Sequence, residues 1–292
     1  MSGMSQSGND APERKLKIYF LPNLLTAGNL FCGFVALTKI VEANIASGDY
    51  SQIKVALGFI LLACIFDLFD GRVARMGGVE SPFGREFDSL ADLVSFGVAP
   101  AFLVHRVVLR DVFESHPEIG WFIASVYLLC GAFRLARFNC LAIVPGAGGG
   151  KEFLGFPIPS AAGLVASLTL LIINLNEHEK SLGRWKYVPL IVLIFLSAMM
   201  VSTVRYPSFK SLGLRSTSTF AKAIAAALVV GGILVIAGQR SVLRTAGYVL
   251  PVVFTAYLVY GFIRPRISRR IREEIEEEDE EELEAGGAGG GE

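Results

Sequence analysis

Long apolar segments, each about as long as a membrane is thick, constrain this sequence more than any other feature. A helix needs roughly 20 consecutive apolar residues to cross a bilayer. Segments of this kind lie at about residues 22–43, 53–75, 86–109, 119–141, 158–176, 187–204, 219–238 and 246–263. Only 18% of the 292 residues are charged, which is too few for a soluble domain of this length. The sequence therefore predicts an all-α integral membrane protein with about eight transmembrane helices.

Eight crossings place both ends of the chain on the same side of the membrane. When the Lys and Arg residues in the loops and near the ends of the spans are sorted by side, seventeen fall on the side of the termini and seven on the other. Cytoplasmic loops contain an excess of these residues. We therefore expect a multi-pass protein of the cell membrane, with both termini and the loop between the second and third spans in the cytoplasm.

The regions that flank the spans differ in composition. Residues 1–12 are polar, and residues 273–292 are mainly acidic residues and glycine, so both regions are predicted to be disordered. Residues 13–20 are basic and amphipathic, which favours a short helix on an anionic membrane surface. Residues 211–272 contain the last two spans and a basic juxtamembrane segment.

Four aspartates lie close together at the end of the second predicted span and the start of the third. Asp67 and Asp70 are three residues apart, and Asp88 and Asp92 are four apart, so each pair shares one face of a helix. The short connection between the two spans favours antiparallel neighbours. We therefore expect the two pairs to face each other across the cytoplasmic end of the helices.

Carboxylates grouped in this way repel one another unless a cation compensates their charge. Oxygen ligands without His or Cys favour Mg²⁺ or Mn²⁺, and this number of carboxylates could hold two ions for phosphoryl transfer. Gly71 and Gly84 have no side chain and permit close approach of a bulky group. Simple helix capping and an ion-coupled transporter are the alternative interpretations, since intramembrane acids also mark ion pathways.

The motif Asp-x2-Asp-Gly-x2-Ala-Arg-x8-Gly-x3-Asp-x3-Asp resembles that of the CDP-alcohol phosphotransferase family. Its eight positions are Asp67, Asp70, Gly71, Ala74, Arg75, Gly84, Asp88 and Asp92. The resemblance implies a membrane domain at residues 13–210, with a polar active-site cavity open to the cytoplasm, and a homodimer. Members of the family use a divalent metal while a second alcohol displaces CMP from a CDP-linked lipid or alcohol.

The same resemblance implies a role for each residue of the motif. Asp67, Asp70 and Asp88 would be metal ligands, and Asp92 would activate the incoming hydroxyl. A metal-assisted displacement needs a base near its nucleophile, which agrees with that role; full metal coordination by Asp92 is the alternative. The expected CDP site consists of Asn23, Thr26, Asp67, Gly71, Ala74, Arg75 and Gly84. For Asn23 and Thr26, which stand at a helix start, ordinary capping is an equal alternative.

Flanking segments at residues 22–33, 134–139, 155–160 and 205–210 look like those of the phosphatidylserine synthases of this family. In the second segment Arg134 and Arg137 can share a helix face, and Arg suits a carboxylate because it can bind both oxygens. We expect Arg134, Arg137 and Asn139 to bind the serine carboxylate or a lipid phosphate. The alternative is that these arginines only extend to the headgroups.

The resemblance therefore implies an enzyme that converts CDP-diacylglycerol and L-serine to phosphatidylserine and CMP. Glycerol-3-phosphate or an inositol phosphate as the acceptor is the alternative within the family. A transporter is the alternative outside it. No nucleic-acid partner is expected.

Overall fold

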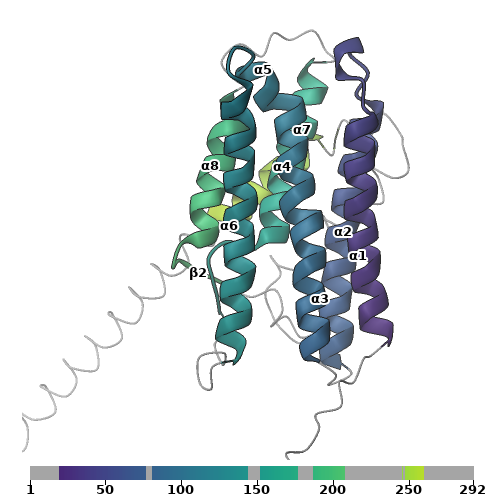
Figure 1. Cartoon of the computed structure of the whole chain (residues 1–292), viewed down its shortest axis with the longest axis vertical. Coiled ribbons are helices and arrows are strands. Elements are labelled where there is room, and N and C mark those ends of the chain that lie inside the picture. Colours follow the sequence, from purple (N-terminus) through teal and green to yellow (C-terminus); the bar gives the residue numbers. More distant parts are fainter. Residues whose placement is uncertain are drawn as a thin grey trace, which may run out of the picture.

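The computed structural model of the chain describes residues 20–76, 81–143, 152–176, 187–207, 245 and 247–259. Over these residues the fold is a bundle of long helices that run up and down along one direction (Figure 1). Its helices are α1 (Phe20–Glu42), α2 (Ser51–Met76), α3 (Pro82–Asp92), α4 (Ala99–Val104), α5 (Arg110–Val112), α6 (Pro117–Ile143), α7 (Ile158–Asn176), α8 (Val188–Val201) and an apolar helix at Gly247–Val259. A 3-10 turn at Ile45–Ser47 lies between α1 and α2.

Five segments of the described chain are long and apolar enough to cross a membrane. They are Leu21–Glu42, Ser51–Gly71, Pro82–Val112, Pro117–Leu141 and Ile158–Asn176. These segments confirm the predicted all-α membrane fold. The sixth and eighth predicted spans correspond to α8 and the Gly247–Val259 helix, which are apolar but shorter. The seventh, at residues 219–238, lies outside the described residues, so the total of eight stays a prediction.

Residues just before two helices show why those helices begin where they do. The backbone amide of Ser51 donates to Asp49 at 2.9 Å, which holds the pKa of that carboxyl below its usual value. At the start of α3, the backbone amide of Gly84 donates to the Ser81 hydroxyl at 3.0 Å, and Pro82 occupies the first turn. Both arrangements satisfy amides that have no partner inside the helix.

The third span follows one path from α3 to α5 but is not a regular α-helix. It contains two π-helical segments, Leu93–Val98 and His105–Leu109. Pro100 has no amide hydrogen, so it cannot donate to the Phe96 carbonyl four residues earlier. The hydroxyl of Tyr127, a fully buried residue of α6, donates to that carbonyl at 3.1 Å. A side chain of a neighbouring helix thus supplies the hydrogen bond that the proline cannot.

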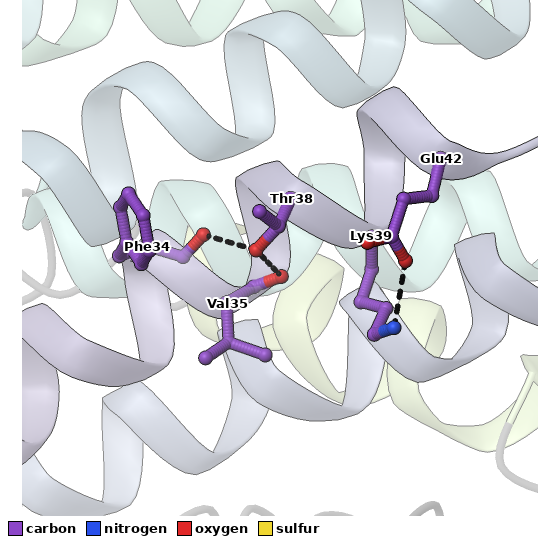
Figure 2. Close-up of polar contacts among 5 residues, drawn as sticks. All are labelled: Phe34, Val35, Thr38, Lys39 and Glu42. Carbon is purple, nitrogen blue, oxygen red and sulfur yellow. Dashed lines mark hydrogen bonds and ion pairs between the residues drawn. The ribbon is translucent and has the colours of Figure 1, made fainter.

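The outer face of α1 shows how a helix can face lipid and still contain polar residues. Phe31 and Phe34 are exposed on it. The exposed hydroxyl of Thr38 lies 2.9 Å from the carbonyls of both Phe34 and Val35, so its polar group is satisfied within the helix (Figure 2). Lys39 and Glu42 pair at 2.7 Å at the end of the helix.

Two three-residue strands connect distant parts of the chain. β1 (Glu152–Leu154) pairs antiparallel with β2 (Arg205–Pro207), with Phe153 opposite Tyr206. The apolar pattern of the sequence predicts neither strand. Gly155 follows β1 with φ +80° and donates its amide to the Val204 carbonyl at 2.8 Å. The pairing brings the chain before α7 next to the chain after α8.

Candidate active site

Three of the four predicted carboxylates meet at one end of the bundle. Asp67 and Asp70 lie on α2 and Asp88 on α3, and one carboxylate oxygen from each lies within 4.8 Å of the others. Asp70 is buried and the other two are partly buried. The end of α2, the beginning of α3 and the end of α6 lie together at the lower end of the bundle in Figure 1. The sequence spacing predicts this grouping.

This group of oxygens fits a hard divalent cation. Among the described residues its ligand atoms come from carboxylates, with no His or Cys in the group. Such a set suits Mg²⁺ or Mn²⁺ better than zinc or copper. The charges of Asp88 and Asp67 also act on Asp70 at short range, and a bound cation would relieve that repulsion. The three aspartates therefore fit the metal that the sequence predicts.

Asp92 lies one helical turn beyond Asp88 and stands apart from this group. Its carboxylate is buried, and its Oδ1 accepts a hydrogen bond from the Asn29 side-chain amide at 3.0 Å. A π-helical segment begins at the next residue, Leu93. π-bulges inside helices are frequent at functional sites. The four aspartates are thus divided by their surroundings into three and one.

One face of α1 supports the carboxylates from the side. α1 packs along α2 and also contacts α3, whereas α2 and α3 make few close backbone contacts with each other. The Thr26 hydroxyl lies 3.1 Å from Asp70 Oδ2 and also 3.1 Å from the Pro22 carbonyl. One turn later Asn29 contacts Asp92. The sequence predicts Thr26 as a site residue but misses Asn29, although the two are three residues apart.

The structure describes the predicted CDP site in part. A Cβ at Gly84 would lie 3.3 Å from Asn23 Oδ1 and 3.2 Å from Ser81 Oγ, so this glycine lets α3 approach α1 closely. Asn23 Nδ2 is buried and makes no hydrogen bond within the described chain. Gly71 lies on α2 and is partly exposed. The side chains of Ala74 and Arg75 lie outside the described structure.

The predicted acceptor residues on α6 have three different environments. Arg134 is 8% exposed, and the charges of Asp92 and Asp67 act on it. Arg137 donates from both terminal nitrogens, at 3.0 Å each, to the carbonyls of Val201 and Ser202 at the end of α8. Arg134 thus interacts with the carboxylates, whereas these two hydrogen bonds of Arg137 lead to α8.

Asn139 has a contact that the sequence does not reveal. Its Nδ2 donates to Glu86 at 3.1 Å and to Ser89 at 3.0 Å, both on α3. Its Oδ1 is buried and has no hydrogen-bond partner among the described residues. Asn139 therefore holds the end of α6 against α3, on the helix that contains Asp88 and Asp92.

A second contributor that the sequence misses is the Gly247–Val259 helix. Tyr257 on this helix is 2% exposed, its ring centroid lies 5.8 Å from that of Phe156, and it interacts electrostatically with Arg134. Phe254 packs against Gly163 of α7, where any side chain would collide with its ring. Arg134 thus interacts both with the carboxylates and with this helix.

Comparison with known proteins gives a consistent result. The profile of the CDP-alcohol phosphatidyltransferase family matches residues 19–195. A protein of Helicobacter pylori named CDP-diacylglycerol–serine O-phosphatidyltransferase is 36% identical over 193 residues, which cover 66% of this chain and 74% of that protein. A Bacillus subtilis protein of the same name is 35% identical, over 65% of this chain and 92% of its own length. An archaetidylserine synthase of Methanothermobacter thermautotrophicus is 32% identical, over 66% and 72%.

Proposed function

Because the chain belongs to the CDP-alcohol phosphatidyltransferase family, we propose that it transfers the phosphatidyl group of CDP-diacylglycerol to L-serine, releasing CMP. The observation that supports this most directly is the division of the four aspartates, with three carboxylates in one group and the buried Asp92 beside them. The names of the similar proteins differ in their lipid part but share serine. Serine is therefore the acceptor that we propose.

The roles follow from what each side chain can do. Asp67, Asp70 and Asp88 would hold one or two Mg²⁺ or Mn²⁺ ions, which neutralise the charge that develops on the pyrophosphate. Asp92 accepts the proton of the serine hydroxyl. The serine oxygen forms a bond to the phosphorus that bears diacylglycerol, and the bond from this phosphorus to the CMP oxygen breaks. CMP then leaves.

Arg134 binds an anionic group of a substrate, which we assign to the serine carboxylate. Its guanidinium is buried, and its Nε has no hydrogen-bond partner among the described residues. A buried cation of this kind needs anionic partners. Asp67 and Asp92 meet this need only in part, because Asp67 would also bind the metal and Asp92 would also accept the proton. Asn23 and Thr26 remain candidates for the CDP site, together with Asp67, Gly71, Ala74, Arg75 and Gly84.

The protein is a multi-pass membrane protein by its five long apolar helices. We further propose that it lies in the cell membrane, with the carboxylates at the cytoplasmic end, and that it forms a homodimer. The excess of Lys and Arg on the cytoplasmic side supports the orientation. The family resemblance supports the homodimer, and chemical cross-linking in native membranes would test it.

The test is CMP release by the purified protein with CDP-diacylglycerol, Mn²⁺ or Mg²⁺, and one alcohol at a time. We expect release with L-serine, with formation of phosphatidylserine, and little with glycerol-3-phosphate or inositol phosphate. Release with glycerol-3-phosphate alone would replace serine as the acceptor. If no alcohol gave CMP release, the enzyme assignment would end and the transporter would be favoured.

A substitution separates the role of Asp92 from that of the metal ligands. Asp92→Asn keeps the shape of the side chain but cannot take up the proton, so turnover should fall at least a hundredfold. Mn²⁺ binding, measured by calorimetry, should stay within a few fold of the wild type. Turnover near that of the wild type would contradict the base role, and loss of Mn²⁺ binding would make Asp92 a ligand.

A further inference from the structure

Two polar residues of α1, one helical turn apart, each contact a different aspartate. Thr26 contacts Asp70, which belongs to the group of three carboxylates. Asn29 contacts Asp92, which lies outside that group. The same helix face therefore contacts one member of the carboxylate group and the separate Asp92 carboxylate, to which the proposed function assigns different tasks. This separation allows the two supports to be tested against each other.

Asn29 is fixed in place more firmly than a simple packing residue would be. It is fully buried, and its backbone carbonyl accepts a hydrogen bond from the Ser95 hydroxyl at 2.9 Å. Any side chain at Gly33, one turn later, would collide with Ser95, so α1 and the π-helical segment Leu93–Val98 approach closely here. The backbone of Asn29 is thus held against the third span at its own carbonyl and again one turn later.

The orientation of the Asn29 amide indicates a role beyond packing. Only the NH₂ group can face a carboxylate, because two oxygens would repel. Its own Oδ1 is then left buried without a hydrogen-bond partner among the described residues. Buried polar atoms are rarely left unsatisfied in proteins, and the exceptions call for an explanation. An apolar residue would avoid this unsatisfied atom, so stability alone does not explain an asparagine at this position.

We propose that Asn29 is a positioning residue for Asp92: its amide fixes the direction in which the Asp92 carboxylate faces, so that the carboxylate meets the acceptor hydroxyl. The inference rests on the proposed function, in which Asp92 takes the proton of serine. A neutral donor suits this task, since it orients a carboxylate without forming an ion pair. Effective proton transfer requires the base within hydrogen-bond reach of its proton, so a rotated carboxylate should slow turnover.

The experiment compares Asn29→Ala with Thr26→Val in the purified protein, with CMP release as the assay. For Asn29→Ala we expect kcat to fall by about ten- to a hundredfold, the range for a hydrogen bond to a charged group. The KM for CDP-diacylglycerol and the Mn²⁺ concentration for half-maximal activity should stay within about twofold. For Thr26→Val, which removes the contact to Asp70, we expect the opposite: a higher Mn²⁺ requirement and a smaller effect on kcat.

Two further variants separate positioning from stability. Asn29→Asp keeps the shape of the side chain but replaces the amide donor by a second carboxyl group, which repels the Asp92 carboxylate or shares a proton with it. It should lose at least as much kcat as Asn29→Ala. Asn174→Ala removes another buried asparagine, on α7, and should lower the melting temperature without changing kcat. If Asn29→Ala is too unstable to assay, Asn29→Asp gives the decisive value.

Three results would overturn the proposal. These are a kcat for Asn29→Asp within twofold of the wild type, a rise in Mn²⁺ requirement equal to that of Thr26→Val, or a fall in kcat for Asn174→Ala that matches the fall for Asn29→Ala. Failure of the proposed function gives a different result, because the wild-type protein would then release no CMP with serine.

Discussion

Arg134 and Arg137 lie three residues apart on α6, yet their surroundings differ. The charges of Asp92 and Asp67 act on the buried Arg134, whereas Arg137 donates to two carbonyls at the end of α8. Side chains that bind the last carbonyls of a helix stabilise its end. We therefore propose that Arg134 binds a substrate and that Arg137 holds α6 against the end of α8.

Substitution of each arginine by Lys should separate these two roles. Lys keeps the charge, but its ammonium group lacks the planar, forked donors with which Arg binds two oxygens at once. Arg134→Lys should raise the KM for serine about tenfold or more, with a melting temperature close to that of the wild type. Arg137→Lys should lower the melting temperature and leave the KM for serine within about twofold. Kinetics and thermal unfolding in the same detergent measure both, and an exchange of the two results would contradict the assignment.

The aspartate group is predictable from sequence because it depends on local spacing. Asp67 and Asp70 share a helix face by their separation of three, and a bound cation would relieve the repulsion between their carboxylates. Asn29 and Asp92 are 63 residues apart. Their contact depends on how α1 packs on α3, which the spacing within either helix does not determine. The contacts of Arg137 at the end of α8 are hidden from the sequence for the same reason, since these partners are 64 and 65 residues away.

At the scale of elements, the α3–α5 path depends on a hydrogen bond from another helix. Tyr127 of α6 donates to the Phe96 carbonyl. Pro100 cannot donate to this carbonyl because proline has no amide hydrogen. Tyr127→Phe should destabilise the protein by about 1–3 kcal/mol, the cost of a buried polar group left without its partner. Thermal or denaturant unfolding of the purified protein in detergent measures this loss.

Pro100→Ala provides the control for that prediction. Alanine restores a backbone amide at position 100, which can donate to the Phe96 carbonyl in place of the tyrosine. Tyr127→Phe should therefore cost less in the Pro100→Ala protein than in the wild type, in a double-mutant cycle. Equal costs in both backgrounds would show that Tyr127 stabilises the protein through packing rather than through this carbonyl.

The elements differ in how well hydrophobicity predicts them. α7 has the predicted limits, 158 and 176, because it is a continuous apolar segment that follows Pro157. The third span is predicted as one helix over 86–109, but its π-helical segments leave no mark in an apolar pattern. β1 and β2 are also missed, since three residues are too few to show a period and their partners are about fifty residues apart.

For the whole molecule, the aspartate end of the bundle is predicted to face the cytoplasm. α6 has 27 residues, roughly 40 Å of helix, so its two ends lie on opposite sides of a bilayer. Ser115, just before α6, and Cys140, near its end, are both exposed. Cys140 lies on the same helix as Asn139, which contacts α3 near Asp88. Labelling of these two positions therefore reports the side on which the carboxylates lie.

A membrane-impermeant maleimide should label Cys140 in inside-out vesicles and leave it unlabelled in right-side-out vesicles. The reverse should hold for Ser115→Cys in a Cys140→Ala background. Cys32 and Cys64 are buried and should contribute little, and labelling in detergent gives the total amount of reactive thiol. The expected direction follows from the seventeen basic residues on one side against seven on the other. Labelling of Cys140 from outside would place the carboxylates away from the cytoplasm and would contradict the proposed orientation.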